Sequence, residues 1–152
     1  MKKQTDPRMH SAEHILNQTM DRMFNCGRCF SAHIERKKSK CDYHFDHVLT
    51  ATEVTEIQDR VNQVIQDNLP VTETFVPREA AGRLYNTDKL PAGLDGQVRI
   101  VHIGDYDACP CIGGHVPSTA QIGGFRITTT SYEDNVLRIR YKLSSARVRS
   151  MQ

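Results

Sequence analysis

Apolar residues near the start of the chain recur at the spacing of an α-helix. They are Met9, Leu16, Met20, Met23 and Phe24. Asp6 is a typical N-cap, Pro7 suits the first helical position, and Gly27 can supply a left-handed stop. We therefore predict a helix over residues 7–24 that packs one apolar face on a core.

A second amphipathic helix is predicted further along the chain. Thr50-Ala51-Thr52-Glu53 has the form of a capping box, in which a hydroxyl and a carboxylate satisfy backbone N–H groups of the first turn. Apolar residues then recur at helical spacing, namely Val54, Ile57, Val61, Val64 and Ile65. Because Pro70 cannot continue a helix, we expect this one to cover residues 51–68.

Shorter alternating or continuously apolar runs predict strands. They are residues 29–35, 41–46, 71–76, 98–103, 122–131 and 136–143. The run at 98–103 is apolar on both faces, which is typical of a central strand. A helical turn is expected at 78–84 and a surface loop at 85–96. Together these elements predict an α+β fold, with two main helices packed on a curved, largely antiparallel sheet.

Composition narrows the class of protein. A chain of 152 residues suffices for one compact domain and is short for two, so we expect a single domain over residues 1–152. No run approaches the roughly 20 apolar residues that cross a bilayer, and five cysteines without a signal peptide favour a reducing cytoplasm. The net charge of +2 does not by itself indicate a polyanionic partner.

Cys26 and Cys29 have the spacing of a redox pair, or of half a zinc site that Cys41 or Cys109 would complete. A plain alternative is that they are small, partly buried thiols where a helix runs into a strand. The sequence leaves both readings open.

Two separated fragments each place metal-ligand side chains four residues apart. His10 and His14 lie one turn apart on a helical face that the core does not use. Cys111 and His115 flank Gly113-Gly114, which predicts a tight loop. Three imidazoles and one thiolate suit Zn²⁺. Spacing alone leaves open two solvated or core histidines, and a buried thiol beside an unrelated histidine.

The segments HSAEHIL at residues 10–16 and CIGGHVPSTAQIGGFRI at residues 111–127 closely resemble the editing domain shared by alanyl- and threonyl-tRNA synthetases. The chain is most similar to the free-standing AlaX proteins, which remove wrongly attached amino acids from tRNA in trans. Three intermediate segments fit the same pattern in the same order, at residues 45–46, 77–81 and 98–103.

This resemblance implies a cofactor and a reaction. One zinc ion would be bound by His10, His14, Cys111 and His115. The expected reaction is hydrolysis of the ester between an amino acid and the terminal ribose of mischarged tRNA, with Ser-tRNA(Ala) as substrate. Ser-tRNA(Thr), a small ester or amide, and a non-catalytic zinc-stabilised RNA-binding module are the alternatives. The family usually reads Cys-Gly-Gly-Thr-His where this chain has Ile112-Gly113-Gly114 between its ligands, so the reaction is better indicated than the amino acid.

Further site residues are expected around the metal. In the family, a hydroxyl on the strand after the first helix helps to recognise serine, and Ser31 is nearest by position. Backbone N–H groups of Gly113 and Gly114 can stabilise an oxyanion. Three carboxylates are candidates to orient the centre from a second layer, namely Asp46, Asp105 and Asp107. The serine also suits an ordinary strand position, and the aspartates suit turns.

The last predicted strand alternates apolar residues with a basic row, which consists of Arg138, Arg140 and Lys142. Such rows are commonly the solvent face of a half-buried strand. Given the resemblance, this row is also a candidate surface for the tRNA backbone. We expect mischarged tRNA as partner and no membrane, and the sequence leaves the oligomeric state open.

Overall fold

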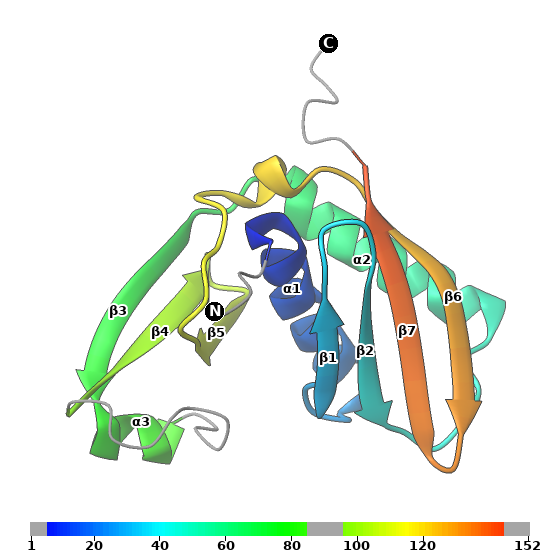
Figure 1. The fold of residues 1–152 in the computed structure, drawn as a ribbon, viewed down its shortest axis with the longest axis horizontal. Helices are drawn as coiled ribbons and strands as arrows, with labels where there is room; N and C mark the ends of the chain where they lie inside the picture. The colour runs from blue at the N-terminus through cyan, green and yellow to red at the C-terminus, as the bar shows by residue number, and fades with distance from the viewer. Residues whose placement is uncertain (1–5, 85–95, 145–152) are drawn as a thin grey trace, which may run out of the picture.

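The fold consists of two main helices and two antiparallel sheets (Figure 1). The computed structural model describes residues 6–84 and 96–144. The helices are α1 (Pro7–Phe24), α2 (Ala51–Gln66) and the short α3 (Arg78–Leu84), with a 3₁₀ turn η1 (Thr119–Ile122). The predicted fold class is confirmed. Apart from Gly96, the surface loop predicted at 85–96 lies outside the described residues.

The larger sheet has four strands in the order β1-β2-β7-β6. Their bounds are β1 (Ser31–Ile34), β2 (Ser39–His44), β6 (Phe125–Glu133) and β7 (Val136–Leu143). The smaller sheet has the order β3-β4-β5. Its strands are β3 (Val71–Pro77), β4 (Gln97–Ile103) and β5 (Asp107–Pro110). All the pairings in both sheets are antiparallel.

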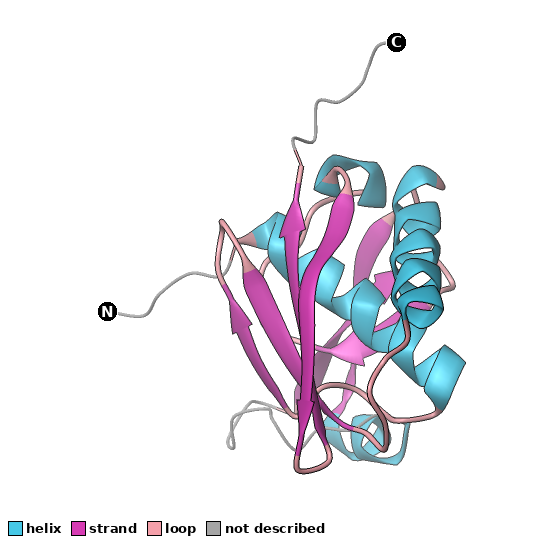
Figure 2. Ribbon diagram, turned by 90° about the vertical axis from the view of Figure 1, so that its right-hand side faces the viewer, coloured by secondary structure: helices cyan, strands magenta, loops and turns pink. Residues whose placement is uncertain are grey.

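Both main helices lie on one face of the four-stranded sheet (Figure 2). The α2 helix buries the apolar residues of its predicted face, Ile57, Val61, Val64 and Ile65. The facing strands contribute alternate side chains to this core, among them Cys41, Tyr43, Leu137, Ile139 and Tyr141. The opposite face of the sheet, which carries the basic row of β7, is left to solvent.

The α1 helix lies between the two sheets (Figure 1). Asp6 caps it, since the carboxylate accepts hydrogen bonds from the backbone N–H groups of Arg8 at 2.9 Å and Met9 at 3.1 Å. The last helical residue is Phe24, as predicted, but the left-handed residue that caps it is Asn25, with a φ of 55°, and not Gly27. Ser11 and Thr19 are as buried as the apolar residues, so the helix has core on more than one side.

The structure differs from the sequence prediction in three elements. The strands form two sheets instead of the single predicted sheet. The α1 helix packs between these two sheets and contacts a strand of each. β5 was not predicted, since its acidic start resembles a turn. The segment expected to open the closing hairpin forms η1, so β6 begins at Phe125. No helix in the described ranges is long and apolar enough to cross a membrane.

The capping box of α2 is present and gives a testable contribution to stability. Thr50 Oγ1 accepts from the Glu53 N–H at 3.1 Å, and Glu53 Oε1 accepts from the Thr50 N–H at 2.9 Å. Thr50→Ala is expected to lower the free energy of unfolding by about 1 kcal/mol, because a helix N–H loses its partner. Urea denaturation measures this. Thr52→Ala, in the same exposed turn, is the control and should cost nothing, since alanine favours helix. Equal losses in both variants would contradict the capping role.

Candidate metal centre

The two ligand-bearing fragments meet between α1 and the loop that follows β5. His10 and His14 come from α1, and Cys111 and His115 come from the loop, with all four ligand atoms within 4.8 Å of one another. Cys111 Sγ lies 3.4 Å from His10 Nε2 and 3.5 Å from His115 Nε2. The fold therefore brings together groups that are 101 residues apart in the chain.

The loop is held close to α1 by its glycine and by an arginine. A Cβ atom on Gly113 would lie 2.4 Å from His10 Cε1, so any larger residue there would have to displace the His10 ring. Arg99 on β4 donates from Nη1 to the carbonyl oxygens of Cys111, at 3.2 Å, and Gly113, at 2.7 Å. The Gly113 N–H, expected to face an oxyanion, donates to Cys111 Sγ at 3.4 Å. That contact would stabilise a thiolate.

Two of the histidines are oriented through their outer nitrogens. His10 Nδ1 lies 3.1 Å from the Gly114 carbonyl oxygen, and His115 Nδ1 lies 2.9 Å from Ser11 Oγ. The same hydroxyl accepts from the Val116 N–H at 3.2 Å. When Nδ1–H donates outward in this way, the lone pair of Nε2 faces the centre. This tautomer is the one that binds a metal through Nε2.

His14 is backed by a buried carboxylate. Its Nδ1 lies 3.6 Å from Asp107 Oδ2, and the Asp107 side chain is fully buried. Arg28 Nη1 and Gln18 Nε2 each donate to Asp107 Oδ1 at 2.8 Å. Burial alone would raise the pKa of Asp107, but His14 and the charge of Arg28 outweigh it and lower that pKa to about 2. Asp107 is therefore ionised beside the histidine.

His115 is held in its neutral form. Burial, followed by the charges of His14, His10 and Arg99, lowers its pKa to about 2. For His14 the balance is opposite: burial lowers its pKa, while Asp107 and Cys111 raise it more, so the pKa is raised. Three imidazoles and a thiol sulfur converge here. The outer nitrogens of His10 and His115 are hydrogen-bonded, while that of His14 is buried beside Asp107 without a hydrogen bond. This arrangement can hold a metal ion.

Of the three candidate carboxylates, Asp107 alone lies at this centre. The Asp46 side chain is 93% exposed and lies 2.7 Å from His47 Nδ1. Asp105 is exposed in the turn between β4 and β5. Ser31, proposed from position as the serine-recognising hydroxyl, is exposed at the start of β1, opposite Asp42 on the outer face of the sheet.

A second polar group lies beside the metal centre. Its ligand-type atoms, from Glu13, Cys29 and Cys41, lie within 4.8 Å of one another. Cys29 Sγ is 3.5 Å from Glu13 Oε2, and Glu13 Oε1 is 3.7 Å from His10 Nε2. Sequence reasoning missed Glu13, although its place three residues after His10 puts it on the same side of the helix. Cys26 is not part of this group, since its thiol faces the Met20 carbonyl oxygen at 3.7 Å.

The basic row of β7 lies on the solvent face of the larger sheet. Arg138 is paired with Asp42 through two contacts, of 2.7 and 2.9 Å, which lowers the pKa of that carboxyl. Arg140 and Lys142 continue the row. Their cross-strand partners are also basic, namely Lys40 and Arg126. This face therefore gathers cations from three strands.

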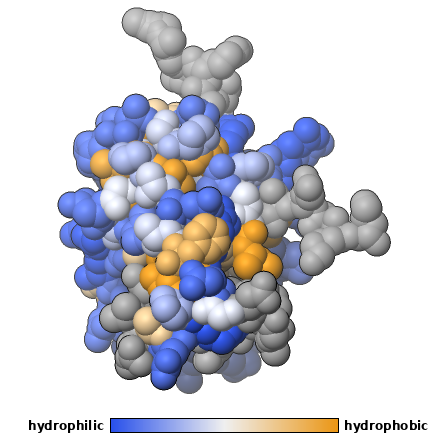
Figure 3. Space-filling view, turned by 90° about the vertical axis from the view of Figure 1, so that its left-hand side faces the viewer, coloured by the Kyte–Doolittle hydropathy of each residue, from blue (hydrophilic) through white to orange (hydrophobic). Residues whose placement is uncertain are grey.

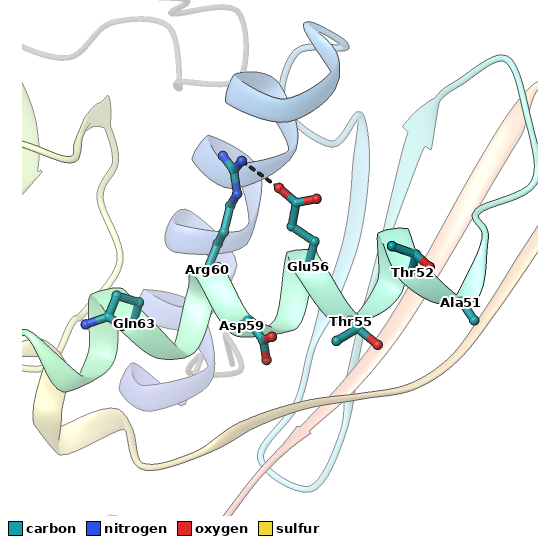
Figure 4. A pocket seen from close by; sticks show the side chains of 7 residues that line it. All are labelled: Ala51, Thr52, Thr55, Glu56, Asp59, Arg60 and Gln63. Carbon is teal, nitrogen blue, oxygen red and sulfur yellow. Dashed lines mark hydrogen bonds and ion pairs between the residues drawn. The ribbon is translucent and has the colours of Figure 1, made fainter.

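Another hollow of the surface lies away from the metal centre. It has a volume of about 590 Å³ and follows the exposed side of α2 (Figure 4). Its lining is Ala51, Thr52, Thr55, Glu56, Asp59, Arg60 and Gln63. Arg60 there donates to Glu56 at 2.6 Å. None of the four candidate ligand residues lines this hollow, so it is not part of the metal centre.

Comparison with known proteins agrees with this geometry. The chain is 32% identical over 129 residues to the alanine–tRNA ligase of Rickettsia massiliae, 31% over 140 residues to that of Aeropyrum pernix, and 29% over 151 residues to that of Methanothrix thermoacetophila. These alignments cover 80%, 88% and 95% of this chain, but the chain spans only 14%, 15% and 16% of those relatives. Residues 98–142, which include the Cys111–His115 loop, match the family described as the threonyl and alanyl tRNA synthetase second additional domain. The chain therefore carries this second additional domain, the editing domain of those synthetases.

Proposed function

We propose that the chain is a zinc-dependent hydrolase that deacylates mischarged tRNA, with Ser-tRNA(Ala) as its substrate. The observation that carries this proposal is the convergence of His10, His14, Cys111 and His115 in a domain of an editing family. The reaction adds water to the ester between the amino acid and the terminal ribose, and it releases the free amino acid and the ribose hydroxyl.

The donor set supports zinc as the ion. Three imidazole nitrogens and one thiolate match the borderline-soft preference and the four-coordinate geometry of Zn²⁺. When bound, the ion would supply a Lewis acid that polarises the ester carbonyl. The chain's own residues would hold it: Asp107 orients His14, and Ser11 orients His115.

The polar groups around the centre would position the ester. The Gly113 N–H is already directed to Cys111, so Gly114 is the proposed backbone donor for the developing negative charge. The Gly114 carbonyl oxygen lies 3.1 Å from His10 Nδ1, so this residue is held beside the candidate ligands. On the larger sheet, Arg140 and Lys142 are proposed contacts for the tRNA backbone, because neither forms an ion pair with a carboxylate of residues 6–84 or 96–144, whereas Arg138 pairs with Asp42.

The proposal is tested by following deacylation of Ser-tRNA(Ala) beside correctly charged Ala-tRNA(Ala). We expect selective release of serine, loss of that release after chelation, and recovery when zinc is added back. A fold measurement by circular dichroism on the chelated protein separates loss of the catalytic ion from unfolding.

Other outcomes identify the alternatives. Release from Ser-tRNA(Thr) alone would keep the reaction and change the tRNA. Comparable turnover of free aminoacyl esters, with no salt-sensitive RNA binding, would indicate a small-ester hydrolase. Chelation that unfolds a protein without any hydrolytic activity would indicate a metal-stabilised RNA-binding module.

A further inference from the structure

The second polar group, formed by Glu13, Cys29 and Cys41, lies between α1 and the larger sheet. Glu13 comes from α1, Cys29 precedes β1, and Cys41 belongs to β2. Both cysteines are thiols, and they are 6% and 0% exposed. The three-stranded sheet, on whose side Figure 3 shows apolar side chains gathered within a hydrophilic surface, contributes none of these residues. The group therefore belongs to the interior of the molecule and not to that face.

The spacing of the second polar group suits ligands of one metal ion. Around a tetrahedral Zn²⁺ with Zn–S of about 2.3 Å and Zn–O of about 2.0 Å, a sulfur and an oxygen ligand lie about 3.5 Å apart. Cys29 Sγ lies 3.5 Å from Glu13 Oε2, and all three ligand-type atoms lie within 4.8 Å of one another. In the neighbouring metal centre, Cys111 Sγ lies 3.4 and 3.5 Å from two imidazole nitrogens. The two groups are thus similarly compact.

The carboxylate of Glu13 loses its positive partner when the neighbouring metal centre is filled. Its side chain is 15% exposed, and within residues 6–84 and 96–144 its ion pair is with His10, whose Nε2 lies 3.7 Å away. That nitrogen faces the metal centre, so with an ion bound there His10 is neutral and has no proton for Glu13. The amide of Asn17, at 3.5 Å, is a distant neutral donor. Buried charges in proteins are paired or bind metals, and a cation beside Glu13 meets that need.

The charges of the two groups are complementary. A divalent ion held by three neutral imidazoles and a thiolate has one positive charge in excess. A divalent ion held by two thiolates and a carboxylate has one negative charge in excess. The two together are neutral, which lowers the cost of burying both ions side by side. Cys29 and Cys41 also set the class of ion, because thiolates select borderline-soft cations such as Zn²⁺ over Mg²⁺ or Ca²⁺.

We propose that the second polar group binds a second divalent, thiophilic cation of the Zn²⁺ class. Its ligands are the sulfurs of Cys29 and Cys41 and one carboxylate oxygen of Glu13, with water in the fourth position. The two thiols release their protons to solvent when the ion binds. Because it has three protein ligands and the neighbouring centre has four, this site fills second. The ion ties α1 to the start of β1 and to β2, and its binding does not depend on the proposed hydrolysis.

The test is a titration of the metal-free, reduced chain with Cd²⁺, which occupies zinc sites and absorbs ultraviolet light in proportion to its bonds to thiolate. The first equivalent should fill the metal centre, with one bond to sulfur, and the second should fill the new site, with two. We therefore expect two steps in absorbance, the second about twice the height of the first. Equilibrium dialysis against excess Zn²⁺, followed by mass spectrometry of the metal, should give about two ions per chain.

Three variants assign the two steps to their sites. Cys29→Ser should remove the second step and leave the first. Glu13→Gln should weaken binding of the second ion at least about tenfold and leave the first unchanged. Cys111→Ser should give the reverse result, with the first step lost and the second kept. Circular dichroism checks the fold of each variant, and Glu13→Gln keeps the test decisive because it leaves both buried thiols in place.

Cys26→Ser is the matched control for Cys29→Ser. Cys26 lies in the same segment, but its thiol faces the Met20 carbonyl oxygen at 3.7 Å. This control should retain both steps. A single step in the unmodified chain would mean that hydrogen bonds alone hold the second polar group, and it overturns the proposal. Two steps that persist in Cys29→Ser and in Glu13→Gln would place the second ion elsewhere and overturn it equally.

Discussion

Changing Cys111 to serine is expected to empty the metal centre and to lower deacylation at least about a hundredfold, since removing even an outer partner of a ligand costs roughly 10- to 100-fold. Cys111 supplies the one sulfur of the centre, 3.4 and 3.5 Å from two imidazole nitrogens. A serine hydroxyl keeps its proton at neutral pH and is a harder donor, so it does not replace a thiolate. Metal per chain by inductively coupled plasma mass spectrometry and single-turnover deacylation are measured together.

Cys109→Ser is the matched control for this variant. Cys109 lies two residues earlier at the end of β5, and burial raises the pKa of its thiol to about 11, so it stays protonated. The control should keep its metal and its rate. His14→Ala, from the other side of the centre, should behave like Cys111→Ser. A metal-free Cys111→Ser protein that still releases serine at the original rate would refute a metal-dependent mechanism.

The helices were predictable because their signals are local. Asp6 and Thr50 both act as N-caps at the predicted positions, and α1 begins and ends at the predicted residues. The apolar face of α2 is also the buried face, since that helix is covered by core on one side only. Periodicity and capping depend on residues within a few positions of each other, and a single sequence contains all of that information.

The division into two sheets was not predictable, because it depends on how α1 is surrounded. Asn17 and Thr19 are polar, and polar residues of a helix commonly face solvent. In the structure, Asn17 Oδ1 accepts from the Tyr43 hydroxyl at 2.7 Å, and Thr19 Oγ1 lies 2.6 Å from the Tyr106 hydroxyl. Distant partners satisfy these groups, so the helix can be buried against both sheets.

The cluster of four candidate ligands could be predicted, whereas the groups that contact it could be predicted only in part: Asp107 was one of three candidate carboxylates, and Ser11 and Arg28 were not foreseen. Each ligand pair has a recognisable spacing within the chain, but Arg28 reaches Asp107 across 79 residues and Ser11 reaches His115 across 104. The choice between Asp105 and Asp107 depends on β5, which places Asp107 against Gln18 and His14 of α1 and leaves Asp105 exposed in the preceding turn. Because that short strand was missed, the sequence treated the two carboxylates as equivalent.

The second large effect is expected from a substitution of Asp107. Asp107→Asn is expected to lower the free energy of unfolding by about 3 kcal/mol, because the partly buried Arg28 loses the charge of its fully buried partner. It should also weaken zinc binding about 10- to 100-fold, since His14 loses the carboxylate behind its Nδ1. Urea denaturation of the metal-free protein and competition with a chelator of known affinity measure the two effects.

The pH dependence of stability identifies the same carboxylate. The pKa of Asp107 in the folded chain is about 2, below its ordinary value of 3.8. Its stabilising contribution is therefore complete above the ordinary value and is lost as the pH falls from there through about 2. Metal-free protein should lose stability more steeply over this range than Asp107→Asn, which has no group to protonate at that position.

Asp105→Asn is the control, two residues away in the adjoining turn. Its side chain is exposed, so the substitution should change stability by no more than about 0.5 kcal/mol and leave zinc affinity unaltered. The two variants remove the same charge from the same segment, and their difference isolates what burial against Arg28 and His14 contributes. Equal behaviour in stability, zinc affinity and pH profile would mean that the net charge of the segment matters, and that Asp107 has no particular role in orienting the centre.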